Sequence, residues 1–363
     1  MIHFTLYFFV LLLSWIALVS NIDNKKVLNT CLAVSFFLVL YLVIGFRVDS
    51  IDYVSYKSIF EKVNFSQFSI PIFNSNEGSS GREFLFASSV SLFKLLNLSF
   101  ESFIAFIAFL SVFIKFNIFW RNSPYFWLSV LIYLSFSYFK DLGQIRSALS
   151  ATILVFSFNQ IVSRKFHYYI IYVIIAAGIQ IFLIFAVILY VFHWYFHRYL
   201  KLFLLFFSLF LPDLIFYIYE YSADFIRALN PFIFYKINGY MAVQQDINVF
   251  GLGNIFRVSV VAAMIFMGGW LNFSKSSIVS VSLSSVSLGL IFYNCFSFIP
   301  AVAERSIDVF VFLPACLLFP IFVSKMAGGV QKQIVFMLVV LYCLAFFIGG
   351  VSSAGEYRNL LLV

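Results

Sequence analysis

Four short groups of ionisable side chains lie where long apolar runs begin or end, and each combines a cation with a carboxylate. An arginine fork binds two phosphate oxygens at once and keeps its charge. A nearby carboxylate can act as a general base, taking a proton from a sugar hydroxyl while arginine neutralises a phosphate leaving group. The alternative, which the sequence leaves open for each group, is ion pairing within the membrane. The groups are Arg47, Asp49, Asp52, Tyr53 and Tyr56; Arg82 and Glu83; Lys140, Asp141, Gln144 and Arg146; and Glu304, Arg305 and Asp308.

The composition places these groups in a membrane protein. Of 363 residues, 63% are hydrophobic and 10% are charged, and the mean hydropathy is +1.02. A soluble domain has about a quarter of its residues charged, so most of this surface must face lipid. The sequence has no P-loop, no Rossmann glycine run and no GxSxG motif, which disfavours an ATP-driven pump.

Apolar runs long enough to cross a bilayer predict an all-α polytopic integral membrane protein with 11 to 13 transmembrane helices, forming a single transmembrane domain over residues 1–363. Short connections carry eleven cations and one acid, Asp23, and the positive-inside rule predicts that they are cytoplasmic. Two longer connections, 47–83 and 213–254, carry nine of the fifteen acids, and we expect them to be periplasmic loops. The eleven cations are Lys25, Lys26, Lys115, Arg121, Arg164, Lys165, Arg198, Lys201, Lys275, Lys325 and Lys332.

Several segments predict finer features. Residues 47–62 suit an amphipathic helix on the membrane surface, and 214–240 suit two helices broken at Pro231. Segment 84–98 is short and polar for a span, which favours a re-entrant or interfacial helix, whereas 166–196 predicts two short helices that turn near Gly178 and Gln180. The stretch Ser274–Ser287 predicts a helix packing surface. With this topology all four ionisable groups fall on the non-cytoplasmic side, which is the main indication of function.

In their order along the chain, these groups resemble the motifs of the EpsG-type family of bacterial polysaccharide polymerases, the Wzy-like O-antigen polymerases. Three positions depart from the family pattern: Ser50 or Ile51 stands where a glycine precedes Asp-Tyr, Ser147 replaces a glutamine, and Gln180 replaces a histidine. A glutamine is neither acid nor base, but it can hydrogen-bond a sugar. The matching residues are Phe46-Arg47, Asp52-Tyr53 with Tyr56, Glu83 to Phe86, Ile145 to Ser150, Ile179 to Ile181, and Glu304-Arg305.

The resemblance implies a metal-independent membrane glycosyltransferase that joins undecaprenyl-diphosphate-linked oligosaccharide repeat units at the periplasmic face of the bacterial inner membrane. In this interpretation Asp52 is the catalytic base, with Asp49 next in line, and Arg146 and Arg305 hold the diphosphate. Arg47 and Arg82 pair with or steer the substrate. We expect no cofactor and no metal, because fixed arginines supply the neutralising charge. The other residues expected to bind substrate are Asp49, Tyr53, Tyr56, Glu83, Gln144, Gln180 and Glu304.

The expected partners are the lipid-linked oligosaccharides and membrane lipids, with a flippase and a chain-length regulator of the same lipopolysaccharide pathway, and no nucleic acid. The chief alternative function is a lipid-linked oligosaccharide flippase or another polytopic transporter. A transporter is expected to have related halves and a charged or broken-helix site near mid-membrane, whereas this sequence has no repeat and gathers charge at one face. A membrane acyltransferase would need an early His–acid or Arg/His constellation, which the sequence lacks.

Overall fold

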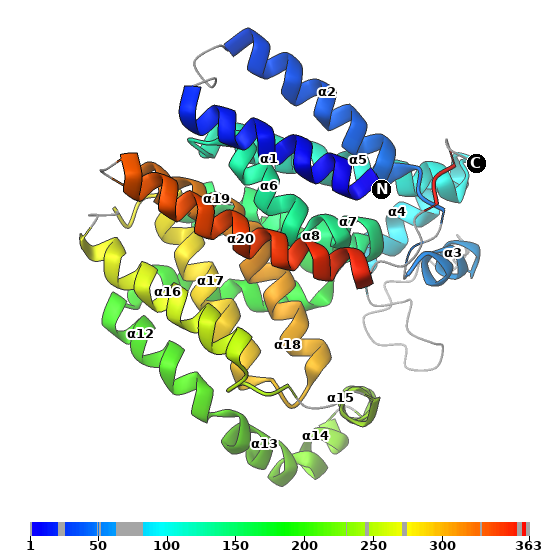
Figure 1. The fold of residues 1–363 in the computed structure, drawn as a ribbon. Coiled ribbons are helices and arrows are strands. Elements are labelled where there is room, and N and C mark those ends of the chain that lie inside the picture. The colour runs from blue at the N-terminus through cyan, green and yellow to red at the C-terminus, as the bar shows by residue number, and fades with distance from the viewer. Residues whose placement is uncertain are drawn as a thin grey trace.

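The computed structural model describes residues 2–20, 26–48, 50, 52–62, 83–229, 231–243, 247–270, 274–326, 329–353 and 358–360. Within these ranges the regular structure is helical, which confirms the predicted all-α fold (Figure 1). The first helices are α1 (Ile2–Ser20), α2 (Lys26–Gly45), α3 (Tyr53–Lys62), α4 (Phe84–Leu95), α5 (Phe100–Asn122), α6 (Phe126–Phe136), α7 (Tyr138–Gly143), α8 (Ile145–Phe156) and α9 (Phe158–Val162). The middle helices are α10 (Phe166–Ile179), η4 (Ile181–Ala186), α11 (Val187–Tyr195), α12 (Arg198–Phe207), η5 (Ser208–Phe210), α13 (Pro212–Tyr221), α14 (Ala223–Leu229) and α15 (Pro231–Val243). The last are α16 (Leu252–Trp270), α17 (Ile278–Cys295), α18 (Pro300–Ile307), η6 (Asp308–Phe312), α19 (Leu313–Ser324) and α20 (Gly329–Ser353).

The helix composition is that of a multi-pass membrane protein. Seven helices of the described chain are long and apolar enough to cross a membrane, or eight if the bent pair Arg198–Phe210 and Pro212–Tyr221 is one span. Five further apolar helices have only 10–17 residues. The sequence-based count of 11 to 13 is higher because it treated several of these shorter helices as spans. The side of the membrane on which each connection lies stays a prediction.

The short and broken helices follow the sequence pattern. The helix α4 has 12 residues, which is about 18 Å of helix and shorter than a bilayer core of about 30 Å. The 166–196 region is divided as predicted, because α10 ends at Ile179 and Gln180 adopts an extended conformation with φ −143° and ψ 111° before η4 begins. An amphipathic helix also forms in the first long connection, but α3 begins at Tyr53 rather than at residue 47.

The helix α6 forms the centre of the bundle. All of its residues are buried, and it packs against α1, α5, α19 and α20. A helix that is apolar on every face is expected in a buried position. Two hydrogen bonds fix its place: Trp127 Nε1 donates to Asn29 Oδ1 on α2 at 2.7 Å, and Ser129 Oγ donates to the carbonyl of Cys316 on α19 at 2.6 Å.

A buried ion pair joins α5 to α7 inside this core. The ammonium of Lys115 lies 2.6 Å from Asp141 Oδ2, and both side chains are almost completely inaccessible. Ser111 and Tyr133 donate hydroxyl hydrogen bonds of 2.6 and 2.7 Å to the same carboxylate. The sequence placed Lys115 in a short connection with Arg121, but Lys115 lies within α5 and is buried, because charge near the end of an apolar run does not reveal a partner on another helix.

The serine-rich face of α17 packs closely against the segment that carries the last ionisable group. Ser282, Ser284, Ser285 and Ser287 are buried, and Ser285 Oγ donates to the carbonyl of Phe310 at 2.9 Å. A Cβ atom on Gly289 would lie 2.7 Å from the Cβ of Phe310, so only glycine allows this approach. The predicted packing surface is confirmed from Ser282 to Ser287, whereas Ser274 and Ser276 precede α17 and are exposed; the confirmed part fixes the position of η6.

Candidate functional site

Helix ends and helix breaks from five parts of the chain meet around a small cavity of about 190 Å³, here called the charged cavity. The breaks bring polar side chains together that lie far apart in the sequence. Eight of the twelve predicted site residues line it, including all three predicted catalytic residues. The lining residues are Asp52, Tyr56, Glu83, Gln144, Arg146, Ser147, Gln180, Ala301, Glu304, Arg305 and Asp308.

Two glutamines mark breaks in the helices around this cavity. Gln144 separates α7 from α8 with φ −106° and ψ 64°, and its N–H donates to the carbonyl of Lys140 at 2.7 Å. Gln180 is buried at the break after α10, where its amide nitrogen donates to Ser147 Oγ and its amide oxygen accepts from Ser150 Oγ, both at 2.9 Å. Gln180 therefore joins the break after α10 to α8. It also lines the charged cavity.

The opposite wall is formed by α18 and η6. Pro300 occupies the first turn of α18, where its missing N–H is tolerated. Glu304 and Asp308 are four residues apart and so lie on one helix face, and both line the charged cavity. Asp308 begins a π-helical turn, Asp308–Phe312, a type of irregularity that is frequent at functional sites.

Arg146 is held in the cavity by a carboxylate and two aromatic rings. Its guanidinium forms an ion pair with Glu83, the residue just before α4. The same group lies 5.3 Å from the ring centre of Tyr56 and 5.4 Å from that of Phe86, distances that suit cation–π attraction. These contacts fix the direction of the fork while the side chain stays 33% exposed, so it remains accessible to an anion.

Asp52 is the half-buried carboxylate of the cavity. Burial raises its pKa above the usual value of 3.8, and the positive charges of Arg146, Lys140 and Arg305 offset part of that rise. Burial also raises the pKa of Tyr56, so its phenol stays neutral near pH 7. A carboxylate with a raised pKa is a better proton acceptor than an exposed one.

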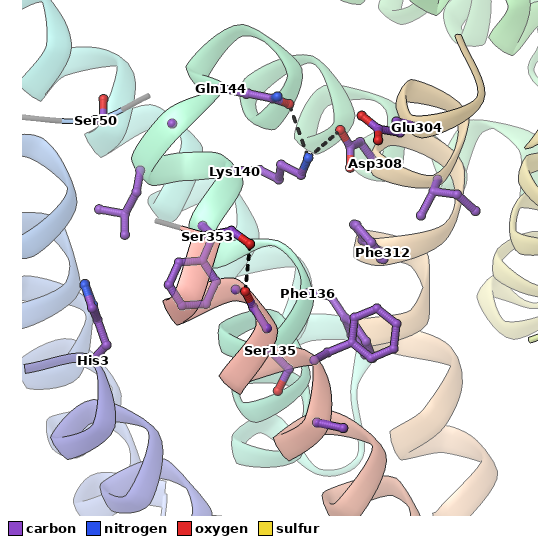
Figure 2. A pocket seen from close by; sticks show the side chains of 18 of the residues that line it. His3, Ser50, Ser135, Phe136, Lys140, Gln144, Glu304, Asp308, Phe312 and Ser353 are labelled. Atoms are coloured by element: carbon purple, nitrogen blue, oxygen red, sulfur yellow. Dashed lines mark hydrogen bonds and ion pairs between the residues drawn. The ribbon is translucent and has the colours of Figure 1, made fainter. Parts of the chain in front are cut away.

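Lys140 and Asp308 belong to this site although sequence reasoning gave them no role. Their side chains form an ion pair of 2.9 Å, and Lys140 also donates to Gln144 Oε1 at 3.4 Å. Figure 2 shows Lys140 reaching from α7 to both partners. The sequence did contain a signal for these two residues. Lys140 and Gln144 are four residues apart, as are Glu304 and Asp308, and this spacing places each pair on one helix face.

Four predicted residues are not part of the charged cavity as described. Asp49 and Arg82 lie outside the described residues. Arg47 is buried near it, where Nη1 donates to the carbonyl of Ile44 at 2.7 Å and Nε donates to Ser50 Oγ at 3.3 Å. Tyr53 packs its ring against Phe100 with 5.2 Å between centres.

A larger cavity of about 640 Å³, here called the main cavity, adjoins the charged cavity, and Figure 2 shows side chains that line the main cavity. The two share Gln144, Glu304 and Asp308 as lining residues. Arg47 and Ser50 lie in the wall of the main cavity, and its other side is aromatic, with Phe136 and Phe312 stacked at 5.5 Å. The main cavity is therefore a space next to the charged cavity that is large enough for more than one sugar ring.

Both long connections contribute to the site. The first supplies Asp52 and Tyr56, and its helix α3 is tied to α4 because Lys94 Nζ donates to the carbonyl of Glu61 at 2.8 Å. From the second connection, the ring centre of Tyr240 on α15 lies 6.0 Å from the guanidinium of Arg305. The first connection thus lines the charged cavity, and the second contacts one of its arginines.

The arrangement can bind an anion and accept a proton in one place. Three cations, Lys140, Arg146 and Arg305, act on Asp52, and two of them line the same cavity as its carboxyl group. Within the described ranges, no group of three or more His, Cys, Asp or Glu residues is placed to hold a metal ion.

Comparison with protein families matches residues 29–361 to the EpsG family. No curated protein and no solved structure matches the chain. The match covers nearly the whole chain and includes every residue of the charged cavity. The helices that converge on Asp52, Arg146 and Arg305 are therefore those of a membrane protein of polysaccharide biosynthesis, and the chain belongs to the EpsG family.

Proposed function

We propose that the protein is a polysaccharide polymerase, a metal-independent glycosyltransferase that joins undecaprenyl-diphosphate-linked oligosaccharide repeat units at the periplasmic face of the bacterial inner membrane. The observation that carries this proposal is the charged cavity, where the carboxyl group of Asp52 shares one small space with the guanidinium groups of Arg146 and Arg305. Membership of the EpsG family supports a role in polysaccharide synthesis.

In the proposed reaction, the acceptor is a sugar hydroxyl at the non-reducing end of a new lipid-linked unit. Asp52 accepts the hydroxyl proton while the oxygen forms a bond to the anomeric carbon of the donor chain. The bond from that carbon to the diphosphate oxygen breaks, and undecaprenyl diphosphate leaves with the bonding electron pair. Arg146 and Arg305 neutralise the charge that develops on the leaving group.

The surrounding side chains have supporting roles in this proposal. Glu83 and Tyr56 hold Arg146 in place, and Gln144 and Glu304, which line both cavities, accept or donate hydrogen bonds to sugar hydroxyls. The main cavity gives room for the rings next to the reacting bond. A flippase and a chain-length regulator of the same pathway are the proposed partners.

A flippase remains the second candidate function, because it would also bind a lipid diphosphate. Glycosyl transfer requires a proton acceptor beside the phosphate ligands, and this cavity places the carboxyl group of Asp52 beside Arg146 and Arg305. That arrangement favours group transfer.

Complementation of a deletion strain tests the proposal. The strain receives the wild-type gene, Asp52→Asn, Arg146→Ala or Arg305→Ala, with Arg227→Ala as a control at an exposed arginine outside the cavity, and its lipopolysaccharide is resolved on a gel. The three cavity variants should keep single capped repeat units and lose the ladder, while Arg227→Ala keeps the ladder. Loss of even the single unit indicates a flippase, and a full ladder from Asp52→Asn overturns its role as base.

A further inference from the structure

A third cavity adjoins the main cavity, and its wall is formed mostly by apolar side chains. This apolar groove has a volume of about 350 Å³ and shares Phe136, Arg257 and Phe312 with the main cavity. Its wall contains one charged residue, Arg257, and is otherwise apolar except for the hydroxyl of Tyr342.

The groove runs along helices and opens to the side of the bundle. On α19 its wall extends from Ala315 to Phe322, which is about 10 Å of helix. Two of its residues on α16 and α20, Phe256 and Leu338, are 51% and 60% exposed. In Figure 1 these two helices lie on the same face of the bundle. A long apolar chain could therefore enter from the lipid without passing through water.

Arg257 lies where the groove meets the main cavity. It sits in the second turn of α16, with its guanidinium 5.8 Å from the ring centre of Tyr293 and 5.5 Å from that of Phe346. No carboxylate among the described residues lies within ion-pair distance of it. A charged side chain within an apolar helix is rare and marks a candidate functional site.

We propose that Arg257 binds the diphosphate of the acceptor, the new polyprenyl-diphosphate-linked unit, and that the apolar groove holds the first isoprene units of its tail, while Arg146 and Arg305 hold the diphosphate of the donor. The order of the three cavities matches the order of groups in such a molecule, with tail, diphosphate and sugar in sequence. The guanidinium contacts the phosphate next to the lipid, and the sugar end reaches the charged cavity through the main cavity. This inference rests on the proposed function, and it adds a lipid path and a phosphate ligand to it.

Binding measurements test this without requiring glycosyl transfer. Purified protein in lipid nanodiscs is titrated with undecaprenyl diphosphate and, separately, with the uncharged alcohol undecaprenol. Arg257→Gln should weaken binding of the diphosphate about tenfold or more, because a bidentate charged contact is lost, and should leave undecaprenol binding unchanged. Arg227→Gln, at an exposed arginine on α14, is the matched control and should bind both probes like the wild type.

A second pair of variants tests the groove. Leu338→Trp narrows it at an exposed position and should weaken binding of both probes, whereas Leu341→Trp, on the same helix at 57% exposure and outside the groove, should not. The inference is overturned if Arg257→Gln binds undecaprenyl diphosphate as tightly as the wild type does. It is also overturned if Leu338→Trp and Leu341→Trp change probe binding equally. Asp52→Asn should bind the diphosphate normally. If the wild-type protein binds the diphosphate through Arg257 but joins no repeat units, that result counts against the proposed function and not against the lipid path.

Discussion

Glu83 forms an ion pair with Arg146 and thereby joins the residue before α4 to the first turn of α8. The two residues come from separate sequence motifs, and both line the charged cavity. Because the pair is partly exposed, it adds only about 0–1 kcal/mol to stability. Its main effect is to fix the orientation of the Arg146 guanidinium group in the charged cavity.

Replacing Glu83 should therefore affect activity more than stability. In Glu83→Gln the arginine keeps its two ring contacts but loses its charged partner, and we expect polymerisation to fall about 10- to 100-fold with a nearly unchanged melting temperature. The measurements are kcat and thermal unfolding of the purified protein. Glu101→Gln, on α5 and outside the cavity, is the control. Full activity in Glu83→Gln would show that Arg146 needs no such orientation.

The pH dependence should report Asp52. A general base acts when deprotonated, so kcat/KM should rise with pH through its pKa, and burial places that rise above the ordinary value of 3.8. Arg305 stabilises the carboxylate, so Arg305→Gln should raise the pKa further and move the acidic limb to higher pH. If the acidic limb of the kcat/KM profile stays in place in Arg305→Gln, Asp52 is not the titrating group. The same conclusion follows if the limb also moves in the control Arg227→Gln.

The buried pair of Lys115 and Asp141 should control stability. Lys115→Met leaves a buried carboxylate without its cation, which is expected to destabilise the fold by about 3–5 kcal/mol. Adding Asp141→Asn removes the uncompensated charge and keeps an acceptor for Ser111 and Tyr133, so the double variant should melt at a higher temperature than Lys115→Met alone. Lys57→Met, at an exposed site on α3, should change little. No recovery in the double variant would contradict this explanation.

The segment near the C-terminus should matter for the site, because it pairs with the chain just before Asp52. Leu360 N–H donates to the carbonyl of Phe46 at 2.8 Å, and Val48 N–H donates to the carbonyl of Arg358 at 3.0 Å. A chain ending at Ser353 should insert into the membrane yet lose about tenfold or more in kcat, since the Asp52 segment loses this support. Asn359→Ala, which loses one hydrogen bond to the carbonyl of Leu42, should have a smaller effect. Wild-type kcat in the shortened chain refutes the idea.

The sequence predicted the helical fold and most members of the site for a physical reason. Polar side chains at the ends of apolar runs must collect at helix ends, and Gln144 and Gln180 do lie at such breaks. Pairing between distant helices could not be predicted in this way. The contact of Lys140 with Asp308 and the burial of Lys115 both depend on how helices pack, which hydrophobic periodicity does not determine.

Arg257 illustrates the same limit. Its position near the start of an apolar run resembles that of many interfacial cations. Only the packing of α16 against α17 and the lining shared with α19 and α20 reveal that it stands between two cavities. Three-dimensional proximity, rather than residue type, gives it a proposed role.

The central claim, that Asp52 serves glycosyl transfer from a lipid diphosphate, is tested most directly with purified protein and lipid-linked repeat units isolated from a strain lacking the gene. Mass spectrometry follows the lipid-linked products and the released undecaprenyl diphosphate. The wild type should form products of two or more units with one undecaprenyl diphosphate released per bond, and Asp52→Asn should be slower by about 10²–10⁴-fold. Units that remain single with the wild type, or equal rates for Asp52→Asn, would contradict the claim.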